Sequence, residues 1–373
     1  MSIELKIVNT PESLKEFIYL PSKLHQSYGN FVPPFYKDER EFHDPVKNKH
    51  LALSDHIQVL AYINGKAAGR IMGIIYYPWN EKTGEKTARF FMVDCINSQE
   101  IASALLSYIE NWAKTKGMQN LVGPFGFSDK DPQGVQVEGW EHPPVIASVS
   151  HQPYLAELIV ANGYSKFKDC VSYKMEIPEQ LPAFYTNIYN RILSNHRLKL
   201  INFNNRKSLR PYFVPIMRLM NETYKNIYGF VAMQEEDINH LANQYLSVLD
   251  PELVKIVTNE KNEPVAFAMA MANISKGIQN AKGRLWPVGF LYILYDMSHS
   301  TQLDLLLGAV NEKYRGRGLN VLLGISVMET ARKKGMKFMD SHLILEENRL
   351  MRAELEKLGG TIYKRYRIFR KSL

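Results

Sequence analysis

Several features that identify large classes of proteins are scarce in this sequence. Only two cysteines occur among its 373 residues, Cys95 and Cys170, and no C-x-x-C spacing is present. Neither a disulfide framework nor a thiolate zinc site is therefore indicated. The ten histidines include no H-E-x-x-H motif, which is the signature of many zinc peptidases. We expect no metal site.

Long apolar runs are missing as well. No stretch approaches the roughly 20 apolar residues needed to cross a bilayer, and residues 1–17 lack the basic and apolar regions of a signal peptide. We expect a cytoplasmic protein, at most peripheral to the inner face of the membrane. The hydrophobic fraction of 45% and the charged fraction of 23% are typical of globular proteins. A length of 373 residues predicts two domains.

Acidic residues are fewer than basic ones, 38 against 46, and the formal net charge is +8. This excess favours anionic partners such as nucleotides, phosphates or acidic lipid surfaces. Residues 363–373, YKRYRIFRKSL, mix cations with aromatics, a composition that can bind single-stranded nucleic acid. A terminal strand with a solvated basic edge is the simpler interpretation, so we do not expect nucleic acid as a partner. An acidic membrane surface is an equally natural partner for this charge.

The two halves of the chain resemble each other. The helix endings NWAKTKGM at 111–118 and ETARKKGM at 329–336 each place cations in a last turn and a glycine just beyond it, as a left-handed helix cap requires. Upstream, Tyr28-Gly29 corresponds to Tyr228-Gly229. In both halves an apolar strand pair and then a strand and a long helix follow. The repeat predicts two copies of one mixed α/β domain.

The predicted domains span residues 1–178 and 186–373, with the linker between Pro178 and Pro182. The first half also carries a long excursion rich in glycine and proline at 123–146. Such a segment usually serves as a functional loop or as a contact between domains.

The segment KYRGRGLN at 313–320 carries the clearest chemical signal. It follows the apolar run LDLLLGAV and precedes a helix predicted from residue 319. Gly316 and Gly318 allow the backbone to approach a ligand closely, and the helix start presents unpaired N–H groups to an anion. Its cations add charge at the same place. The alternative is a basic turn on the surface.

This order of elements resembles the acyl-CoA-binding half of the GNAT N-acetyltransferase superfamily, in which an R/Q-x-x-G-x-G/A loop wraps the pyrophosphate of coenzyme A. The resemblance covers 205–373 well and 20–175 weakly. The motifs FVPPF at 31–35, GPFGFS at 123–128 and GWEHPPVI at 139–146 are similar to those of a bacterial tandem-GNAT group. Some members of that group are enzymes that acylate long-chain sphingoid bases.

The resemblance implies an α/β fold with two tandem GNAT-like domains around a mixed sheet, the first of them degenerate. It implies an N-acyltransferase that uses acyl-CoA or acetyl-CoA as co-substrate and an amine as acceptor, for which an amphiphilic long-chain base is our first choice. The expected coenzyme A contacts are Gly308, Ala309, Val310, Tyr314, Arg315, Gly316, Arg317, Gly318, Leu319, Asn320 and Asn348. The sequence indicates no oligomeric state.

The first half lacks a copy of the KYRGRGLN loop. Alignment through the shared helix endings places Asn97, Ser98, Gln99 and Glu100 opposite the Arg-Gly-Arg-Gly of the second half. Both glycines and both arginines are replaced, and an acid is gained. We expect no coenzyme A in the first half.

Acyl transfer to an amine requires a base for the amine proton and a proton for the leaving thiolate. The tyrosine that often supplies this proton in related enzymes would fall at position 355, which is a leucine. Strand alternation predicts that Asp340, His342, Ile344 and Glu346 share one face. We therefore expect His342 or Glu346 as the base, with Asp304 as a further candidate. A purely structural role is the alternative for each.

The acceptor site is expected to involve Tyr228, Phe230 and Trp286, although core packing is an alternative for Tyr228. The stretch from Leu285 to Met297 is apolar and aromatic almost throughout. It could line a lipid channel or enter a membrane interface, or it could be a buried helix. Rival functions are a small-amine or protein N-acetyltransferase and a non-catalytic acyl-CoA-binding protein.

Overall fold

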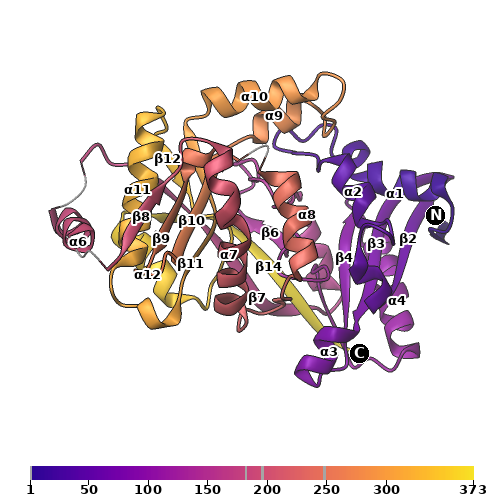
Figure 1. Cartoon of the computed structure of the whole chain (residues 1–373). Helices are drawn as coiled ribbons and strands as arrows, with labels where there is room; N and C mark the ends of the chain where they lie inside the picture. The colour runs from indigo at the N-terminus through magenta and orange to yellow at the C-terminus, as the bar shows by residue number, and fades with distance from the viewer. Residues whose placement is uncertain (1, 181–182, 195–196, 247–248) are drawn as a thin grey trace.

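The computed structural model describes residues 2–180, 183–194, 197–246 and 249–373 (Figure 1). The strands of the first half are β1 (Ile3–Ile7), β2 (Ser54–Ile63), β3 (Lys66–Tyr76), β4 (Thr87–Cys95), β5 (Asn120–Gly123), β6 (Val135–Glu138) and β7 (Ser165–Glu176). Its helices are α1 (Pro11–Leu24), α2 (Tyr36–Phe42), α3 (Tyr77–Thr83), α4 (Gln99–Thr115) and α5 (Tyr154–Ala161).

The second half repeats this order with additions. Its strands are β8 (Lys199–Asn202), β9 (Val254–Thr258), β10 (Pro264–Ala272), β11 (Gln302–Val310), β12 (Phe338–Asp340), β13 (Ile344–Leu345) and β14 (Thr361–Ser372). Its helices are α6 (Ala183–Leu193), α7 (Arg206–Tyr224), α8 (Glu235–Tyr245), α9 (Ser275–Asn280), α10 (Gly289–His299), α11 (Leu319–Lys333) and α12 (Arg349–Lys357).

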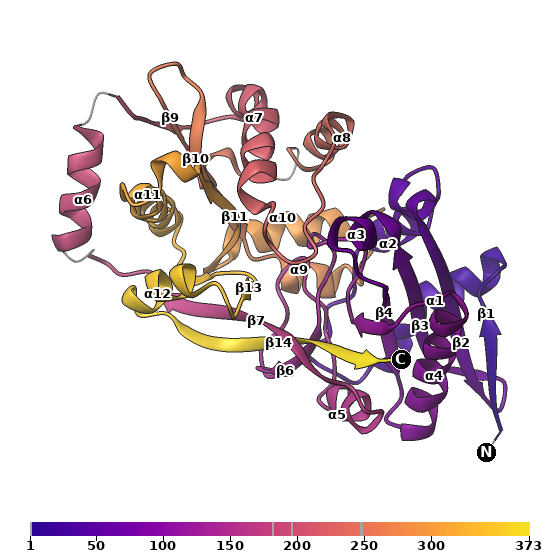
Figure 2. The ribbon, with the colours of Figure 1, turned by 90° about the horizontal axis from the view of Figure 1, so that it is seen from below.

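One mixed sheet runs through the molecule, in the order β1-β2-β3-β4-β5-β14-β7-β12-β11-β10-β9-β8. The pairs β4–β5 and β11–β12 are parallel, and the other pairs along this path are antiparallel. The predicted mixed α/β fold with a repeated unit is therefore confirmed. The order also shows that the last strand of each half lies beside a strand of the other, because β14 pairs with β5 and β7 pairs with β12. Figure 2 shows β7 and β14 side by side between the two groups of strands.

The predicted limits, 1–178 and 186–373, separate β7 from β8 and stay a prediction. Pro178 follows β7, and Pro182 lies outside the described residues.

Each half has a core beneath the helix that ends at a repeated glycine, α4 in the first half and α11 in the second. The apolar stripe predicted for α11 is buried against the sheet, with Leu319, Leu322, Leu323, Val327 and Ala331 at most 3% exposed. The core of the first half lies beneath α4. Both helices end as predicted, since Gly117 and Gly335 have φ of 75° and 81°, the left-handed conformation that glycine adopts without strain.

Two connecting segments tie the halves together. Residues 228–231 of the second half pack on the first so closely that a Cβ at Gly229 would lie 2.1 Å from the Phe125 ring. In return, the side-chain amide of Gln279 donates to the carbonyls of Gly29 and Phe31, both at 3.0 Å. These contacts and the exchanged strands join the two halves. No described helix has the length and apolar character needed to cross a membrane.

Candidate functional site

The two parallel strands of the second half part after a short pairing. Residues 302–304 of β11 pair with residues 338–340 of β12. Beyond Asp304, β11 continues to Val310 and pairs only with β10 among the described strands, with a register shift between Met269 and Ala270. One edge of residues 305–310 is therefore free of strand pairing. A ligand with amide groups could add to this edge.

Gly308 occupies the middle of the free edge and is exposed. The Tyr224 hydroxyl, at the end of α7, donates to the Gly308 carbonyl at 2.8 Å and accepts from the Gly308 amide at 3.4 Å. The neighbouring Ala309 is buried and Val310 is half-buried. Sequence reasoning missed Tyr224, because nothing in the pattern around it distinguishes it from Tyr228.

The free edge leads into the glycine-rich turn and α11. Gly318 is the N-cap residue with φ of 82°, and α11 has neither a side-chain cap nor an acid in its first turn. Gly316 has φ of 73°, and a Cβ there would meet open space. The N-terminal amides of α11 therefore keep their capacity to bind an anion.

The other predicted cofactor residues surround this helix end. Arg315 and Asn320 are exposed, whereas Leu319 is buried in the core. The Arg317 guanidinium lies 5.0 Å from the centroid of the half-buried Tyr314 ring. The turn is thus positively charged and accessible, and all the predicted residues from 308 to 320 lie in one continuous segment of the site.

The equivalent helix start in the first half is built differently. Only Ile96 and Asn97 connect β4 to the N-cap residue, Ser98, whose hydroxyl accepts from the Ile101 amide at 3.4 Å. Glu100 lies in the first turn, where its charge repels an anion. This geometry supports the expectation that only the second half binds the diphosphate.

Two buried carboxyl groups lie where β11 and β12 part. Asp304 and Asp340 are paired residues of the two strands, and both are 0% exposed. Asp304 accepts from the Asn273 amide at 2.7 Å and from the Gln302 amide at 2.8 Å. Burial, with the nearby charge of Asp340, raises the pKa of Asp304 to about 8.

Asp340 is surrounded by donors. It accepts from the backbone amide of His342 at 2.6 Å and from the Tyr363 hydroxyl, and the Lys364 ammonium lies 3.8 Å away. Burial lowers the pKa of Lys364 and raises the pKa of Tyr363. The point where β11 and β12 part therefore holds a compact group of titratable side chains within the core.

The prediction of one continuous strand through His342 is wrong. Residues 341–343 separate β12 from β13, and His342 has φ of 58°, so simple alternation does not hold across this break. His342 Nε2 lies 2.9 Å from the Ile146 carbonyl of the first half. A carbonyl only accepts, so Nε2 carries the hydrogen and Nδ1 keeps its lone pair. Burial lowers the pKa of His342, which leaves a neutral imidazole.

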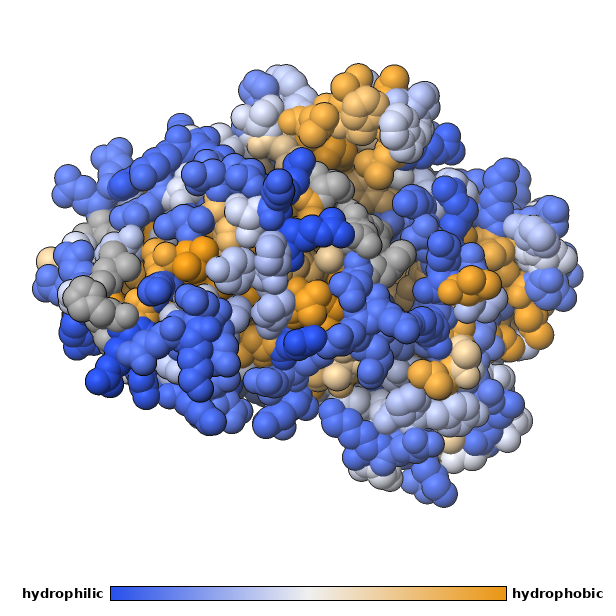
Figure 3. Space-filling view, viewed as in Figure 1, coloured by the Kyte–Doolittle hydropathy of each residue, from blue (hydrophilic) through white to orange (hydrophobic). Residues whose placement is uncertain are grey.

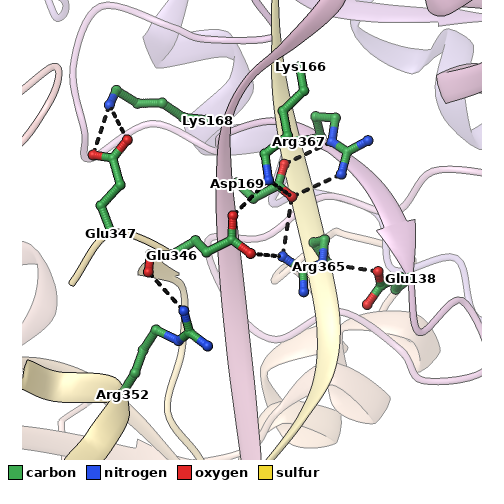
Figure 4. A network of polar contacts seen from close by, with 9 residues as sticks. All are labelled: Glu138, Lys166, Lys168, Asp169, Glu346, Glu347, Arg352, Arg365 and Arg367. Atoms are coloured by element: carbon green, nitrogen blue, oxygen red, sulfur yellow. Dashed lines mark hydrogen bonds and ion pairs between the residues drawn. The ribbon is translucent and has the colours of Figure 1, made fainter. Parts of the chain in front are cut away.

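Glu346 lies in an ion-pair network across β7 and β14 (Figure 4). Its carboxylate contacts the Lys166 ammonium at 2.7 Å and the Arg365 guanidinium at 2.6 Å. The hydrogen bond from Lys166 holds the pKa of Glu346 below its ordinary value. These contacts disfavour proton transfer and favour a structural role. Asn348 opens α12 as its N-cap residue and accepts from the Met351 amide at 3.3 Å.

The three predicted acceptor residues do not share one surface. Tyr228 packs edge-on against the Trp79 and Phe125 rings of the first half. Phe230 is 3% exposed, with the Lys130 ammonium 4.4 Å from its ring centroid. Trp286, in the connection before α10, is 77% exposed. The first two join the halves, and only Trp286 is open to solvent. Among the described residues, no group of His, Cys, Asp and Glu could hold a metal ion.

Comparison with known proteins gives relatives over nearly the whole chain. No protein-family model matches. Protein YghO of Escherichia coli K12 is 27% identical over 96% of this chain and 93% of its own. A protein named bacterial ceramide synthase, from Caulobacter vibrioides, is 26% identical over 98% of this chain and 96% of its own.

Solved structures agree with the duplication. A tandem GNAT protein of the clavulanic acid biosynthesis pathway superposes with a TM-score of 0.57 at 13% identity, covering 100% of this chain and 98% of its own. A GCN5-related N-acetyltransferase from Sphaerobacter thermophilus gives a TM-score of 0.51 at 12% identity, covering 99% of this chain and 95% of its own. The resemblance drawn from the sequence is confirmed at the level of architecture: the chain has the tandem GNAT fold.

Proposed function

We propose that the protein is an N-acyltransferase whose second half binds an acyl-CoA thioester and transfers the acyl group to the amine of a long-chain base. The observation that carries this proposal is the free edge of β11 leading directly into the uncapped start of α11. A strand edge suits the amides of a pantetheine arm, and a helix start suits a diphosphate. The first half is proposed to be degenerate and to shape the site through the loop that carries Ile146.

The residues present fit a coenzyme A thioester. The amides from Gly316 to Asn320 and the side chains of Arg315 and Arg317 would hold the diphosphate. The bond from the Gly308 amide to the Tyr224 hydroxyl is long, at 3.4 Å, and in the complex this amide would donate instead to the thioester carbonyl or to the pantetheine arm. A donor aimed at the carbonyl oxygen stabilises the negative charge that develops there.

His342 is the proposed base. Its Nε2 hydrogen is engaged by Ile146, and no described residue hydrogen-bonds to Nδ1. As the carbon–nitrogen bond forms and the carbon–sulfur bond breaks, the amine proton passes to Nδ1 and then to the leaving thiolate. The lowered pKa keeps the imidazole neutral near pH 7. Asp304 and Asp340 would position this region through Asn273 and the His342 backbone.

Two observations favour a long-chain base as the acceptor. The Caulobacter relative named as a ceramide synthase aligns with nearly the whole chain, and the apolar α10 adjoins the site. A small amine would need no such surface.

The test is an assay of purified protein with sphinganine and acyl-CoA thioesters from two to eighteen carbons, followed by mass spectrometry of the N-acyl product and by release of free thiol. We expect an amide product and a preference for long chains. A preference for acetyl-CoA with small amines would favour the acetyltransferase, whereas thioester binding without thiol release would favour the acyl-CoA-binding protein.

A further inference from the structure

We propose that α10 and the turn before it form a docking surface for an anionic membrane. Large apolar and aromatic side chains in this segment are exposed by 46% to 77%. They form an apolar patch over α10 at the edge of the molecule (Figure 3). The docking surface consists of Trp286, Val288, Leu291, Tyr292, Leu294 and Tyr295.

This concentration is unusual within the molecule. No other span of ten residues holds more than two of the large hydrophobic side chains that the structure shows as exposed. Single exposed apolar residues are ordinary, whereas a contiguous group marks an interaction site. The alternative of a buried helix is wrong for most of α10, since Gly289 and Ile293 are its buried residues.

The buried side of α10 is firmly anchored. Ile293 packs with Met271, Ile274 and Ile278 in one apolar cluster. The Gly277 amide donates to the Asp296 carboxylate at 2.6 Å, which ties α10 to α9. The exposed side chains are therefore held outward by a fixed support.

The composition suits a lipid interface. Tryptophan and tyrosine prefer the boundary between headgroups and acyl chains. The 11 residues of α10 span only about 16 Å, so the helix would lie in the plane of the membrane rather than cross it.

The exposed charge of residues 275–299 is mostly positive and favours an anionic surface over a neutral one. Lys276, Lys282 and Arg284 are exposed beside the docking surface. From 275 to 299 the single acid is Asp296, and its carboxylate is engaged by Gly277. Cations that flank an apolar patch attract acidic lipid headgroups.

The docking surface lies next to the proposed catalytic region. Leu306 of β11 packs against the same apolar cluster as Ile293, and Asn273, two residues before α9, donates to Asp304. A membrane at α10 would bring an amphiphilic acceptor close to the split between β11 and β12. This last step rests on the proposed function, whereas docking itself does not.

The experiment measures co-sedimentation of the full-length protein with vesicles of phosphatidylcholine alone or with 30% phosphatidylglycerol, in the absence of any substrate. We expect binding to the anionic vesicles. The Leu291→Glu, Leu294→Glu double variant should lower the partition coefficient by at least about tenfold, because two apolar side chains lose their burial in lipid. The matched control, Val46→Glu with Val160→Glu, changes two other exposed residues and should bind like the unchanged protein.

A charge variant tests whether exposed cations favour binding to an anionic membrane. Lys276→Gln with Lys282→Gln should weaken anionic binding by roughly fivefold for each cation removed. Circular dichroism checks that every variant is folded. Docking is rejected if the unchanged protein sediments with neither kind of vesicle, or if the α10 variant binds as tightly as the control. It is also rejected if light scattering shows a dimer that the α10 variant disrupts while vesicles stay unbound.

Discussion

At the scale of single residues, the structure places the three candidates for the catalytic base, one imidazole and two carboxyl groups, in different environments. His342 has a positive φ, which costs energy for any residue with a Cβ and commonly marks functional positions. Asp304 is buried where the strands part, and Glu346 is engaged by Lys166 and Arg365. The three groups therefore differ in the ease with which they can move a proton.

Replacing His342 tests its role as the base. His342→Gln retains a donor for the Ile146 carbonyl but removes the basic Nδ1. We expect kcat to fall by about 10² to 10⁴-fold with little change in the KM for acyl-CoA. Because the pKa of His342 lies below 6.5, the unchanged enzyme should lose activity only at lower pH, as the imidazole becomes protonated.

The pH-rate profile checks this assignment. The variant should lack the acidic limb, while His56→Gln, a change at an exposed histidine of the first half, should keep it. Equal turnover in His342→Gln and the unchanged enzyme would exclude the assignment.

Asp304 offers a prediction about stability. Its folded pKa of about 8 lies above the ordinary carboxyl value of 3.8, so between these limits the folded state keeps a proton that the unfolded state releases. Stability is then lost as pH rises through this window, by at most about 1.4 kcal/mol per pH unit. Asp304→Asn removes this dependence.

Thermal unfolding from pH 5 to pH 9 provides the measurement. The Tm of the unchanged protein should fall relative to that of Asp304→Asn as the pH rises. Parallel curves for the two proteins would contradict the raised pKa.

At the scale of elements, the turn between β11 and α11 was predictable from sequence because glycine, cations and an apolar helix stripe are local signals. The helix endings at Gly117 and Gly335 were predictable for the same reason. The break between β12 and β13 was not, because His342 is held by a hydrogen bond to Ile146 of the other half. The exposed face of α10 was also beyond local pattern, since an apolar run looks the same whether protein or lipid covers it.

The two glycines of the turn should respond differently to alanine. At Gly316 a Cβ meets open space, whereas at Gly318 it would lie 2.8 Å from Ile188 of α6. Both have positive φ, which costs about 1 to 2 kcal/mol for alanine. We expect both changes to weaken coenzyme A binding in calorimetry, and Gly318→Ala to lower the Tm further than Gly316→Ala. Gly324→Ala, in α11 with open space around its Cβ, serves as the control and should bind normally.

At the scale of the whole molecule, the exchange of β7 and β14 joins the halves more strongly than a repeat suggests. Asp169 of β7 is buried and accepts from Arg367 of β14 at 2.8 and 2.9 Å. Although burial opposes ionisation, Arg367 and Lys166 hold the pKa of Asp169 below its ordinary value. The duplication could be predicted from sequence, but the exchange could not. Either β7 or β14 beside β5 would satisfy the same apolar pattern.

Separating the halves tests this dependence. We expect residues 1–178 expressed alone to lack a cooperative thermal transition, since β5 and β7 lose their neighbour β14 and Asp169 loses its ion pair with Arg367. Residues 186–373 should behave similarly. Co-expression of both pieces should restore a soluble complex, measured by size exclusion and circular dichroism. A sharp, independent transition in the first piece would contradict the prediction.

The exchanged strand also sets the order of events during synthesis. The ribosome makes β4 and β5 early, yet the second neighbour of β5 in the sheet is β14, which follows every other strand of the sheet in the sequence. At translation rates of about 5 to 20 residues per second, the first half waits roughly 10 to 50 seconds with an open sheet edge. A nascent chain in that condition can pair with other chains through the open edge, so we expect its yield in the cell to depend on chaperones that shield the growing polypeptide until β14 emerges.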